Sequence, residues 1–224
     1  MEQKGVKAQL SMNNIFRRIW YKVVNGISFK AHNVEHGTFY ISGYIRIYRN
    51  LSPGKSIKGS LIKIGDGFGC NSGLKHNPIG GDTCTILRTI DDGKIVIGNN
   101  VGISNASLVA RDKIEIQDNV LLGGGVKIYD NDFHSLDFHT RIYNPYSDIK
   151  SLPVIIKTGA FIGAGSYILK GVTVGEHSIV GAGSVVTKSI PDGEVWAGNP
   201  ARFIRRVIDT QMNNTIIYDT DRKD

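Results

Sequence analysis

The chain has 224 residues, a formal net charge of +7 and two cysteines. This length is enough for one sizeable core, and two cysteines without a CxxC motif exclude a disulfide-stapled scaffold and favour the cytoplasm. No apolar run approaches the ~20 residues of a membrane span. The basic excess favours anionic partners, but nucleic acid is not expected because no nucleic-acid-binding module is recognised.

The first expected element is a short amphipathic helix over residues 12–25. Apolar residues such as Ile19 and Val23 recur on one face of it. Asn25 and Gly26 predict its end, because glycine tolerates the left-handed conformation that closes many helices. Arginines and asparagines interrupt its apolar positions, so a signal peptide is not expected. We expect the helix to cap the fold that follows, and the alternative is contact of its basic flank with a membrane surface.

Residues 38–92 alternate between apolar and polar positions in short stretches, as in residues 38–42 and 44–47. This pattern predicts imperfect coils of the regular structure that follows. The stretch NSGLKHNPIGGD, residues 71–82, predicts a loop because of its Gly, Asn and Pro content.

Residues 94–190 carry the strongest pattern in the chain. From Ile156 to Val186 an aliphatic residue occupies every sixth position, and glycine follows Ile162, Val174 and Val180. A period of six fits neither a helix nor a plain strand. It predicts a chain that winds a triangular prism, with the aliphatic side chain inside and the glycine permitting a tight corner. The same spacing links Ile97, Ile103 and Val109 and, after one extra residue, Ile116, Leu122 and Ile128.

The repeat is interrupted at position 134, where the next aliphatic slot holds His134, and it resumes at residue 154. The excursion 135–153 is polar and aromatic, and long excursions from a compact domain are often functional. A histidine at a broken wall is expected to face a groove, where its neutral imidazole can take a proton from a hydroxyl group. Asp130 or Asp132 could orient that imidazole, although both are also typical turn residues. The alternative for His134 is a partly buried structural histidine.

After Pro191 the chain is expected to leave the prism as a turn, an extended segment and a short helix from Pro200, with frayed residues at 213–224. The predicted organisation has three parts. Residues 1–37 form a helical or capping segment, residues 38–190 form a β-helix with the loop 135–153, and residues 191–224 form a C-terminal extension.

With these residues in view, the chain resembles the hexapeptide-repeat acyltransferases, most closely the galactoside and maltose O-acetyltransferases and the O-acetyltransferases of bacterial surface polysaccharides. The resemblance covers about residues 60–207. It rests on the repeat, on DFHS at 132–135, on GAGSVVTK at 181–188 and on AGNPAR at 197–202. It implies a left-handed parallel β-helix and direct transfer of an acetyl group from acetyl-CoA to a hydroxyl of a sugar or glycan, with His134 as general base.

The resemblance also implies the other site residues. Ala164 and Ala182, with glycines beside them, leave a smooth groove for the pantetheine arm of CoA. Asn105 and Asp132 are candidates for acceptor contacts; Ser104 is an alternative to Asn105, which could instead be a corner residue. Relatives share a homotrimer with shared sites, so we expect one here. The residues implied at the phosphate end of CoA, where cations hold anions, are Thr187, Lys188, Arg202 and Arg205.

Two other classes of function remain open. His134 and His139 form the H-x₄-H spacing that γ-class carbonic anhydrases use for zinc, with His76 as the only central candidate for a third ligand. Three such histidines must converge at ~2.0–2.1 Å from the metal. A non-catalytic β-helix used for assembly is the other alternative, against which the interrupting loop and the cationic C-terminal segment argue.

Overall fold

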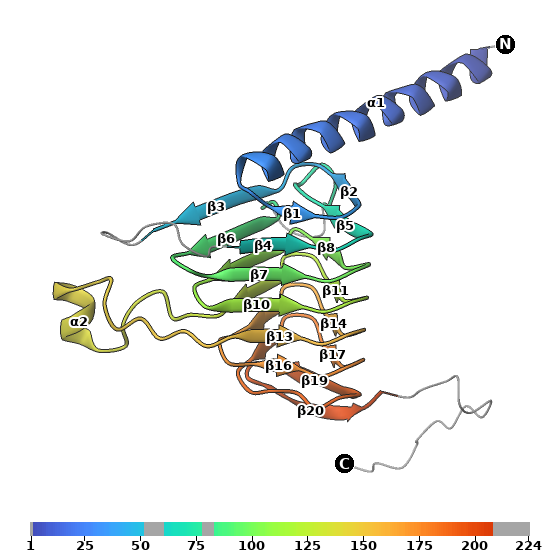
Figure 1. Cartoon of the computed structure of the whole chain (residues 1–224). Helices are drawn as coiled ribbons and strands as arrows, with labels where there is room; N and C mark the ends of the chain where they lie inside the picture. The colour runs from blue at the N-terminus through green and yellow to red at the C-terminus, as the bar shows by residue number, and fades with distance from the viewer. Residues whose placement is uncertain (1, 52–60, 78–82, 208–224) are drawn as a thin grey trace, which may run out of the picture.

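The computed structural model describes residues 2–51, 61–77 and 83–207, with side chains from residue 15 onward. Within these ranges the chain winds into a stack of coils whose three walls are sheets of parallel strands (Figure 1). The predicted left-handed parallel β-helix is therefore confirmed. Residues 78–82 of the loop predicted over 71–82, and the end 213–224 predicted to be frayed, lie outside the described residues.

Successive strands fall in turn on three walls, which we call A, B and C. Wall A contains β1 (Glu35–His36), β4 (Leu61–Ile64), β7 (Lys94–Ile97), β10 (Lys113–Ile116), β13 (Val154–Ile156) and β16 (Thr173–Val174). Wall B contains β2 (Phe39–Ser42), β5 (Phe68–Asn71), β8 (Gly102–Ser104), β11 (Leu121–Leu122), β14 (Phe161–Ile162), β17 (Ile179–Val180), β19 (Glu194–Gly198) and β20 (Ala201–Arg206). Wall C contains β3 (Arg46–Asn50), β6 (Ile86–Ile90), β9 (Ser107–Ala110), β12 (Lys127–Tyr129), β15 (Tyr167–Ile168) and β18 (Val185–Val186).

The aliphatic ladder forms the core of the prism. All six residues predicted from Ile156 to Val186 are completely buried. One position of the upper ladder was predicted wrongly: Leu108, not Val109, stacks on Ile128 and is completely buried. The corner before β9 consists only of Asn105 and Ala106, so the register shifts by one residue and the side chain of Val109 turns to the outer face of wall C.

The glycines that follow the aliphatic residues serve a purpose other than the one predicted. Gly163, Gly175 and Gly181 do not adopt positive φ angles. A Cβ atom on Gly163 would instead lie 2.5 Å from the backbone nitrogen of Ala182 in the next coil. These glycines are therefore needed because neighbouring coils approach closely. The left-handed corner conformation belongs to later glycines, such as Gly165 (φ 71°) and Gly183 (φ 69°).

The N-terminal helix α1 spans Glu2–Ala31 and passes through Gly26, so its predicted end at residues 25 and 26 is wrong. Asn25 is a docking residue rather than a stop signal. Its amide donates to the carbonyl oxygen of Gly43 at 3.0 Å and accepts from the backbone nitrogen of Ile45 at 3.1 Å. With the completely buried Phe29, this places the last turns of α1 over the first coil, as expected for a cap.

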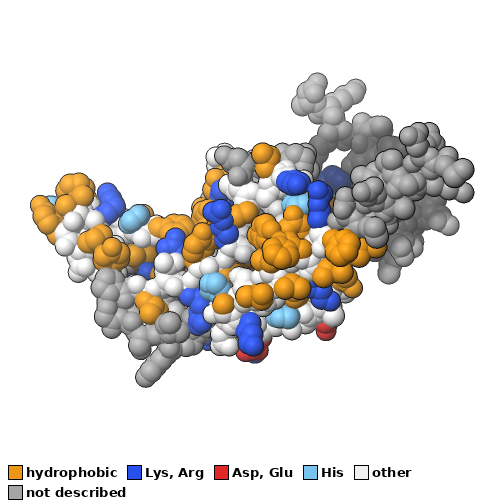
Figure 2. All heavy atoms as spheres, turned by 90° about the horizontal axis from the view of Figure 1, so that it is seen from above, with side chains coloured by type: hydrophobic (Ala, Val, Ile, Leu, Met, Phe, Trp, Pro, Cys, Tyr) orange, Lys and Arg blue, Asp and Glu red, His pale blue; other side chains and the backbone are white. Residues whose placement is uncertain are grey.

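The remainder of α1 extends beyond the prism (Figure 1). Its apolar side chains between Ile15 and Ile27 are largely exposed, and Trp20 is 59% exposed. Seen from above, hydrophobic side chains gather on the top of the molecule with lysines and arginines among them (Figure 2). Within the described ranges, none of the helices combines the length and apolarity required to cross a bilayer.

The C-terminal helix predicted from Pro200 is wrong. The segment forms strand β20, which runs antiparallel to β19 and pairs Phe203 with Trp196. Because β19 is the last strand that the coils add to wall B, its outer edge would be unpaired without β20, and the hairpin satisfies those backbone groups. The loop 135–153 also differs from a plain loop, because it contains the short helix α2 (Phe138–Tyr143).

Candidate active site

His134 lies at the edge between walls C and A, which we call the C/A edge. The chain leaves the prism there after β12 and returns to it with β13. The side chain of His134 is exposed, and its backbone N–H donates to the carbonyl oxygen of Asp132 at 2.7 Å. The preceding residue, Phe133, has a φ angle of 61° and packs its ring edge-on against Tyr129 at 5.1 Å. The imidazole is thus held at a sharp corner with its ring open to the surroundings, rather than buried as a structural histidine.

Asp130, one of the two candidates for orienting His134, serves another purpose. Its buried carboxylate accepts hydrogen bonds from the backbone nitrogens of Arg111 and Asp112, each at 2.8 Å, and from the side chain of Asn131 at 3.0 Å. Burial raises the pKa of this carboxyl, and these hydrogen bonds oppose the shift. Asp130 is therefore a corner residue that joins two coils, as its turn propensity allowed.

The two carboxylate oxygens of Asp132 differ in their hydrogen bonding. Its Oδ1 accepts from the Nζ of Lys170 at 2.5 Å, and its side chain is only 17% exposed. Its Oδ2 is buried, and no residue that the structure describes donates a hydrogen bond to it. A buried carboxylate oxygen without a donor is costly, which marks Asp132 as an unusual residue at the root of the loop.

The loop that follows His134 extends away from the prism (Figure 1). Asp137 caps α2 by accepting from the backbone nitrogen of Thr140 at 2.7 Å. His139 stacks on Tyr143, with ring centroids 6.4 Å apart and an interplanar angle of 11°. No residue of α2 is buried in this chain, and Tyr143 is 80% exposed. The helix therefore presents an aromatic surface to whatever lies beside the C/A edge.

A second set of predicted residues gathers at the edge between walls B and C, the B/C edge. Gly124, Ala164 and Ala182 follow one another down consecutive coils there. The N–H of Gly165 donates to the carbonyl oxygen of Gly124, and that of Gly183 donates to the carbonyl oxygen of Ala164, each at 2.8 Å. We call these three residues the small-residue column. A Cβ atom added at Gly165 or Gly183 would meet nothing within 4 Å, so the space beside the column is open and a thin ligand can lie against the backbone.

Gly124 was not predicted as part of this column. The sequence holds a signal for it, the glycine triplet 123–125. The inserted loop 135–153 lies between that triplet and Ala164. The alignment of the two therefore depends on how many residues between them belong to the loop and how many to the coil.

Asn105 lies at the same edge, one coil above Gly124, but its side chain is already engaged. It is buried with a φ angle of 48°. Its Oδ1 accepts from the backbone nitrogen of Gly73 at 2.7 Å, and its Nδ2 donates to the carbonyl oxygen of Asn77 at 3.2 Å. Within one chain Asn105 therefore anchors the turn 72–77, which favours its corner role over an acceptor contact. The carbonyl oxygen of Ser104 likewise accepts from the backbone nitrogen of Gly125 at 3.0 Å.

The predicted cations divide between the two edges. Arg202 pairs with Ala197 in the terminal hairpin, and a Cβ atom on Gly181 would lie 2.8 Å from the Cβ of Ala197, so Arg202 lies near the lower end of the small-residue column. Arg205 pairs with Val195, further along the hairpin. Thr187 and Lys188 follow β18 and lie at the C/A edge, below His134. All four side chains are exposed.

The candidate site thus consists of two halves that flank wall C. One half contains His134, Asp132, Thr187 and Lys188 at the C/A edge. The other contains Ala164, Ala182, Arg202 and the engaged Asn105 at the B/C edge. A single chain does not bring His134 to the small-residue column, because wall C separates the two edges.

The three histidines of the zinc alternative do not converge within one chain. His76 lies in the turn at the B/C edge, where its Nε2 is 3.0 Å from the hydroxyl of Tyr21. His134 lies at the other edge of wall C, and His139 is engaged with Tyr143 on α2. Across the described residues, no group of three or more His, Cys, Asp or Glu side chains is placed to hold a metal ion. The donor set of one chain therefore does not fit zinc.

Comparison with known proteins identifies the repeat. The family model of the bacterial transferase hexapeptide (six repeats) matches residues 153–188. A Saccharomyces cerevisiae protein provisionally named as an acetyltransferase is 37% identical over 124 residues, which cover 54% of this chain and 60% of the relative. The mitochondrial gamma carbonic anhydrase 2 of Arabidopsis thaliana is 33% identical over 171 residues, which cover 72% of this chain and 49% of the relative.

Among solved structures, the chain is similar to a variant of AntD, an N-acyltransferase from Bacillus cereus in complex with dTDP-4-amino-4,6-dideoxyglucose and coenzyme A. The TM-score is 0.61 at 25% identity, covering 84% of this chain and 91% of that chain. The chain spans 60% and 49% of the length of the two curated relatives described above. The predicted resemblance to hexapeptide-repeat acyltransferases is confirmed.

Proposed function

Because the chain carries the hexapeptide repeat of bacterial transferases, we propose that it is an acetyl-CoA-dependent O-acetyltransferase that acts on a hydroxyl of a sugar or glycan. The observation that carries this proposal is the small-residue column, a smooth strip of backbone along the B/C edge that ends near Arg202. The similarity to an N-acyltransferase in complex with coenzyme A and an amino-sugar nucleotide supports both the cofactor and the class of acceptor.

The pantetheine arm would lie along Ala182 and Ala164, with the thioester toward the upper coils. Small residues allow the arm to contact the backbone directly. Arg202 would hold a phosphate of the CoA head, because a guanidinium group binds phosphate through two parallel hydrogen bonds. Thr187, Lys188 and Arg205 remain proposed phosphate contacts, with Lys188 acting as a point charge.

The chemistry would be a direct transfer. His134 would accept the proton of the acceptor hydroxyl as its oxygen attacks the thioester carbon. The tetrahedral intermediate then collapses with cleavage of the C–S bond, and the imidazolium returns its proton to the leaving CoA thiolate. Such a base is typically worth ~10²–10⁴ in rate. Asp132 remains a proposed contact of the acceptor, and its Oδ2 is buried in the free chain.

The separation of the two half-sites supports a homotrimer with shared sites. A second copy packed on wall C would bring its own C/A edge, with His134, toward the small-residue column of the first. The lower part of wall C suits such packing because Tyr167 is exposed on its outer face, below the cavity that Val109 and Tyr129 line. Closed three-fold symmetry would satisfy all three copies. It would also keep water from the thioester.

The identity to a carbonic anhydrase favours one alternative, a γ-class carbonic-anhydrase-like zinc enzyme. His139 argues against it, because this histidine lies on the exposed helix α2, stacked on Tyr143, rather than on a coil. A non-catalytic assembly protein is the third class, and binding of acetyl-CoA would argue against that class.

Intact-mass analysis of candidate acceptors after incubation with acetyl-CoA and the protein tests the proposal. We expect one acetyl group on a sugar or glycan, and the panel should include amino sugars as well as hydroxyl compounds. Acetylation of no acceptor, together with zinc at one ion per chain by elemental analysis, would rank the carbonic-anhydrase alternative first instead.

We also propose a cytoplasmic location with α1 at a membrane surface. The support is the exposed apolar face of α1, which Arg17, Arg18 and Lys22 flank. Helices of this composition lie in the interface of anionic membranes.

A further inference from the structure

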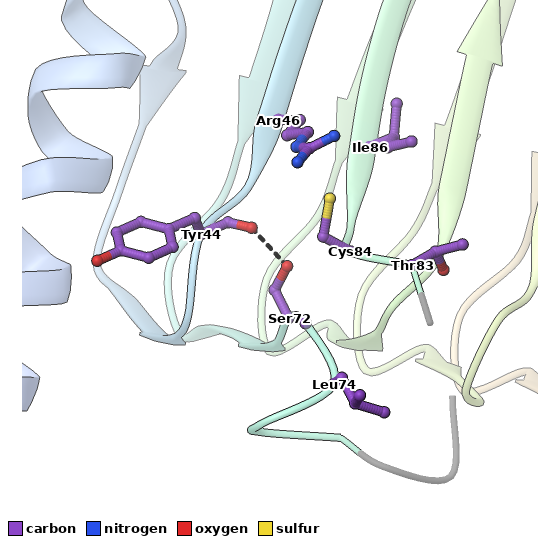
Figure 3. Close-up of a pocket in the computed structure, with 8 residues that line it drawn as sticks. Tyr44, Arg46, Ser72, Leu74, Thr83, Cys84 and Ile86 are labelled. Carbon is purple, nitrogen blue, oxygen red and sulfur yellow. Dashed lines mark hydrogen bonds between the residues drawn. The ribbon is translucent and has the colours of Figure 1, made fainter. Parts of the chain in front are cut away.

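A cavity of about 440 Å³ lies at the B/C edge, above the small-residue column. Its position follows from strand pairing: Asn71 pairs with Ser104, so Ser72 stands one coil above Asn105. Arg46, Cys84 and Ile86 line one side of the cavity, and Leu74 lies on the turn below (Figure 3). The Tyr44 ring points away from Arg46, so its backbone rather than its ring forms the wall (Figure 3).

The floor of this cavity is held rigidly. The hydroxyl of Ser72 donates to the carbonyl oxygen of Tyr44 and accepts from the backbone nitrogen of Thr85 at 2.9 Å. The next residue, Gly73, donates its N–H to Asn105. Three segments that are distant in the sequence therefore meet at Ser72, and the cavity is formed before any ligand arrives.

A second cavity, of about 380 Å³, adjoins the first and shares Ile86 with it. Arg46 pairs with Ile86 and Tyr48 pairs with Arg88 on the adjacent strands β3 and β6. Alternate residues of a strand share a face, so these four side chains share the outer face of wall C. The second cavity extends to Tyr129, whose ring contacts Phe133 beside His134. We call the two cavities together the arginine groove.

The arginine groove is strongly cationic. None of the residues that line its two cavities is an aspartate or glutamate. Within the described ranges, Arg46 has no acidic partner, and the Nε of Arg88 is buried without a hydrogen-bond acceptor. The neighbouring turn adds the cation Lys75. Burial lowers the pKa of His76 on the same turn, and the charges of Lys75 and of Arg17 on α1 lower it further.

We propose that the arginine groove binds the acceptor and that the acceptor carries an anionic group held by Arg46 and Arg88. This inference rests on the proposed acetyl transfer, because it places the acceptor at the upper end of the column along which acetyl-CoA would lie. The anionic group is a carboxylate, as in an acidic sugar, or a phosphate, as in a nucleotide sugar. Guanidinium groups bind both through paired, charge-assisted hydrogen bonds.

Steady-state acetyl transfer to three acceptors tests this inference: p-nitrophenyl glucuronide, p-nitrophenyl glucoside and dTDP-glucose. We expect the wild-type chain to prefer the glucuronide or dTDP-glucose over the neutral glucoside. Arg46→Gln should raise the KM of the preferred anionic acceptor roughly 10- to 100-fold and leave the KM of acetyl-CoA unchanged. The anionic acceptor whose KM rises in Arg46→Gln shows whether the groove binds a carboxylate or a phosphate. Arg88→Gln should act in the same direction, and Lys94→Gln on wall A is the control.

Equal use of all three acceptors, or equal effects of Arg46→Gln on charged and neutral acceptors, would overturn the inference. If no acceptor is acetylated, the proposed function fails. Saturation-transfer NMR without acetyl-CoA then tests separately whether the arginine groove binds an anionic sugar. Glucuronide or dTDP-glucose should bind the wild-type chain and lose signal in Arg46→Gln. Thermal melts of both variants show whether a loss of binding reflects unfolding. If it does, the preference of the wild-type chain for anionic over neutral acceptors is the test of the inference.

Discussion

The Nζ of Lys170 lies 2.5 Å from the Oδ1 of Asp132 and ties the root of the inserted loop to the corner of the next coil. Asp132 also accepts the backbone N–H of His134 through its carbonyl oxygen. The direction in which the chain carries His134 out of the prism is therefore set by a contact between coils.

If His134 is the general base, His134→Ala should lose about 10²-fold or more in turnover with little change in the affinity for acetyl-CoA. Steady-state kinetics and a CoA-binding titration measure the two quantities. His139→Ala is the matched control and should be much milder, because His139 stacks on Tyr143 away from the C/A edge. Equal losses in both variants, accompanied by loss of bound metal, would favour the zinc alternative.

The cations are expected to distinguish CoA from dephospho-CoA. Replacing Lys188 and Arg205 by alanine should weaken acetyl-CoA more than its dephospho derivative, since only acetyl-CoA carries the 3′-phosphate. Arg202→Ala should weaken both cofactors, because Arg202 lies nearest the small-residue column. Isothermal titration with both cofactors provides the comparison. If the Lys188 and Arg205 variants lose the same affinity for both cofactors, those residues do not bind the 3′-phosphate.

The two half-sites predict complementation between chains. A His134→Ala chain lacks the base, and an Ala182→Trp chain has a blocked column. Each alone should be inactive, and mixing them after reversible dissociation should restore part of the activity if one site uses both copies. Sedimentation equilibrium should give three chains per particle. A fully active monomer would reject the trimer, whereas a trimer without complementation would reject only the shared site.

The two cysteines should differ in reactivity. Burial raises the pKa of the Cys70 thiol from its ordinary value of 9.0 to about 12, opposed by a hydrogen bond with Thr85. Cys70 should therefore remain a neutral, unreactive thiol at pH 8, while the partly exposed Cys84 reacts with Ellman's reagent. One thiol should titrate in the folded protein and both after unfolding. Two fast-reacting thiols in the folded state would show that the top coils open.

The same shift predicts how stability depends on pH. The folded-state pKa of Cys70 lies above its unfolded value, so its contribution is complete below pH 9 and is lost as the pH rises toward 12. Denaturant unfolding across this range, compared with Cys70→Ala, isolates the effect. A Cys70→Ala chain with an unchanged pH slope would contradict it.

The exposed face of α1 should bind anionic vesicles. Wild-type chain should co-sediment with phosphatidylglycerol vesicles more than with phosphatidylcholine vesicles, and added salt should weaken the binding. Ile19→Asp should abolish it, whereas Asp at the equally exposed Leu121 on wall B should not. If both variants bind as well as wild type, α1 has another partner, such as α1 of a second copy.

The six-residue period by itself determined the prism. An aliphatic residue at every sixth position can be buried on each wall in turn only if the chain turns a corner every six residues, and Ile156 to Val186 obey this rule without exception. The alignment of Ala164 with Ala182 on consecutive coils also follows from the sequence, because the two residues occupy equivalent places in that period.

The tertiary structure decided what depends on contacts between coils. Gly26 does not end α1 because Asn25 docks on Gly43, and Pro200 does not begin a helix because β20 pairs with β19. The short corner at Asn105 shifts the register of the coil by one residue, so that Leu108 rather than Val109 is buried. The inserted loop separates Gly124 from Ala164 in the sequence, and only the hydrogen bond between their coils aligns the two residues. The separation of His134 from Ala182 by wall C was likewise invisible in the sequence. A period specifies which edge a residue shares within an uninterrupted run of coils, but a shortened corner or an inserted loop breaks that alignment.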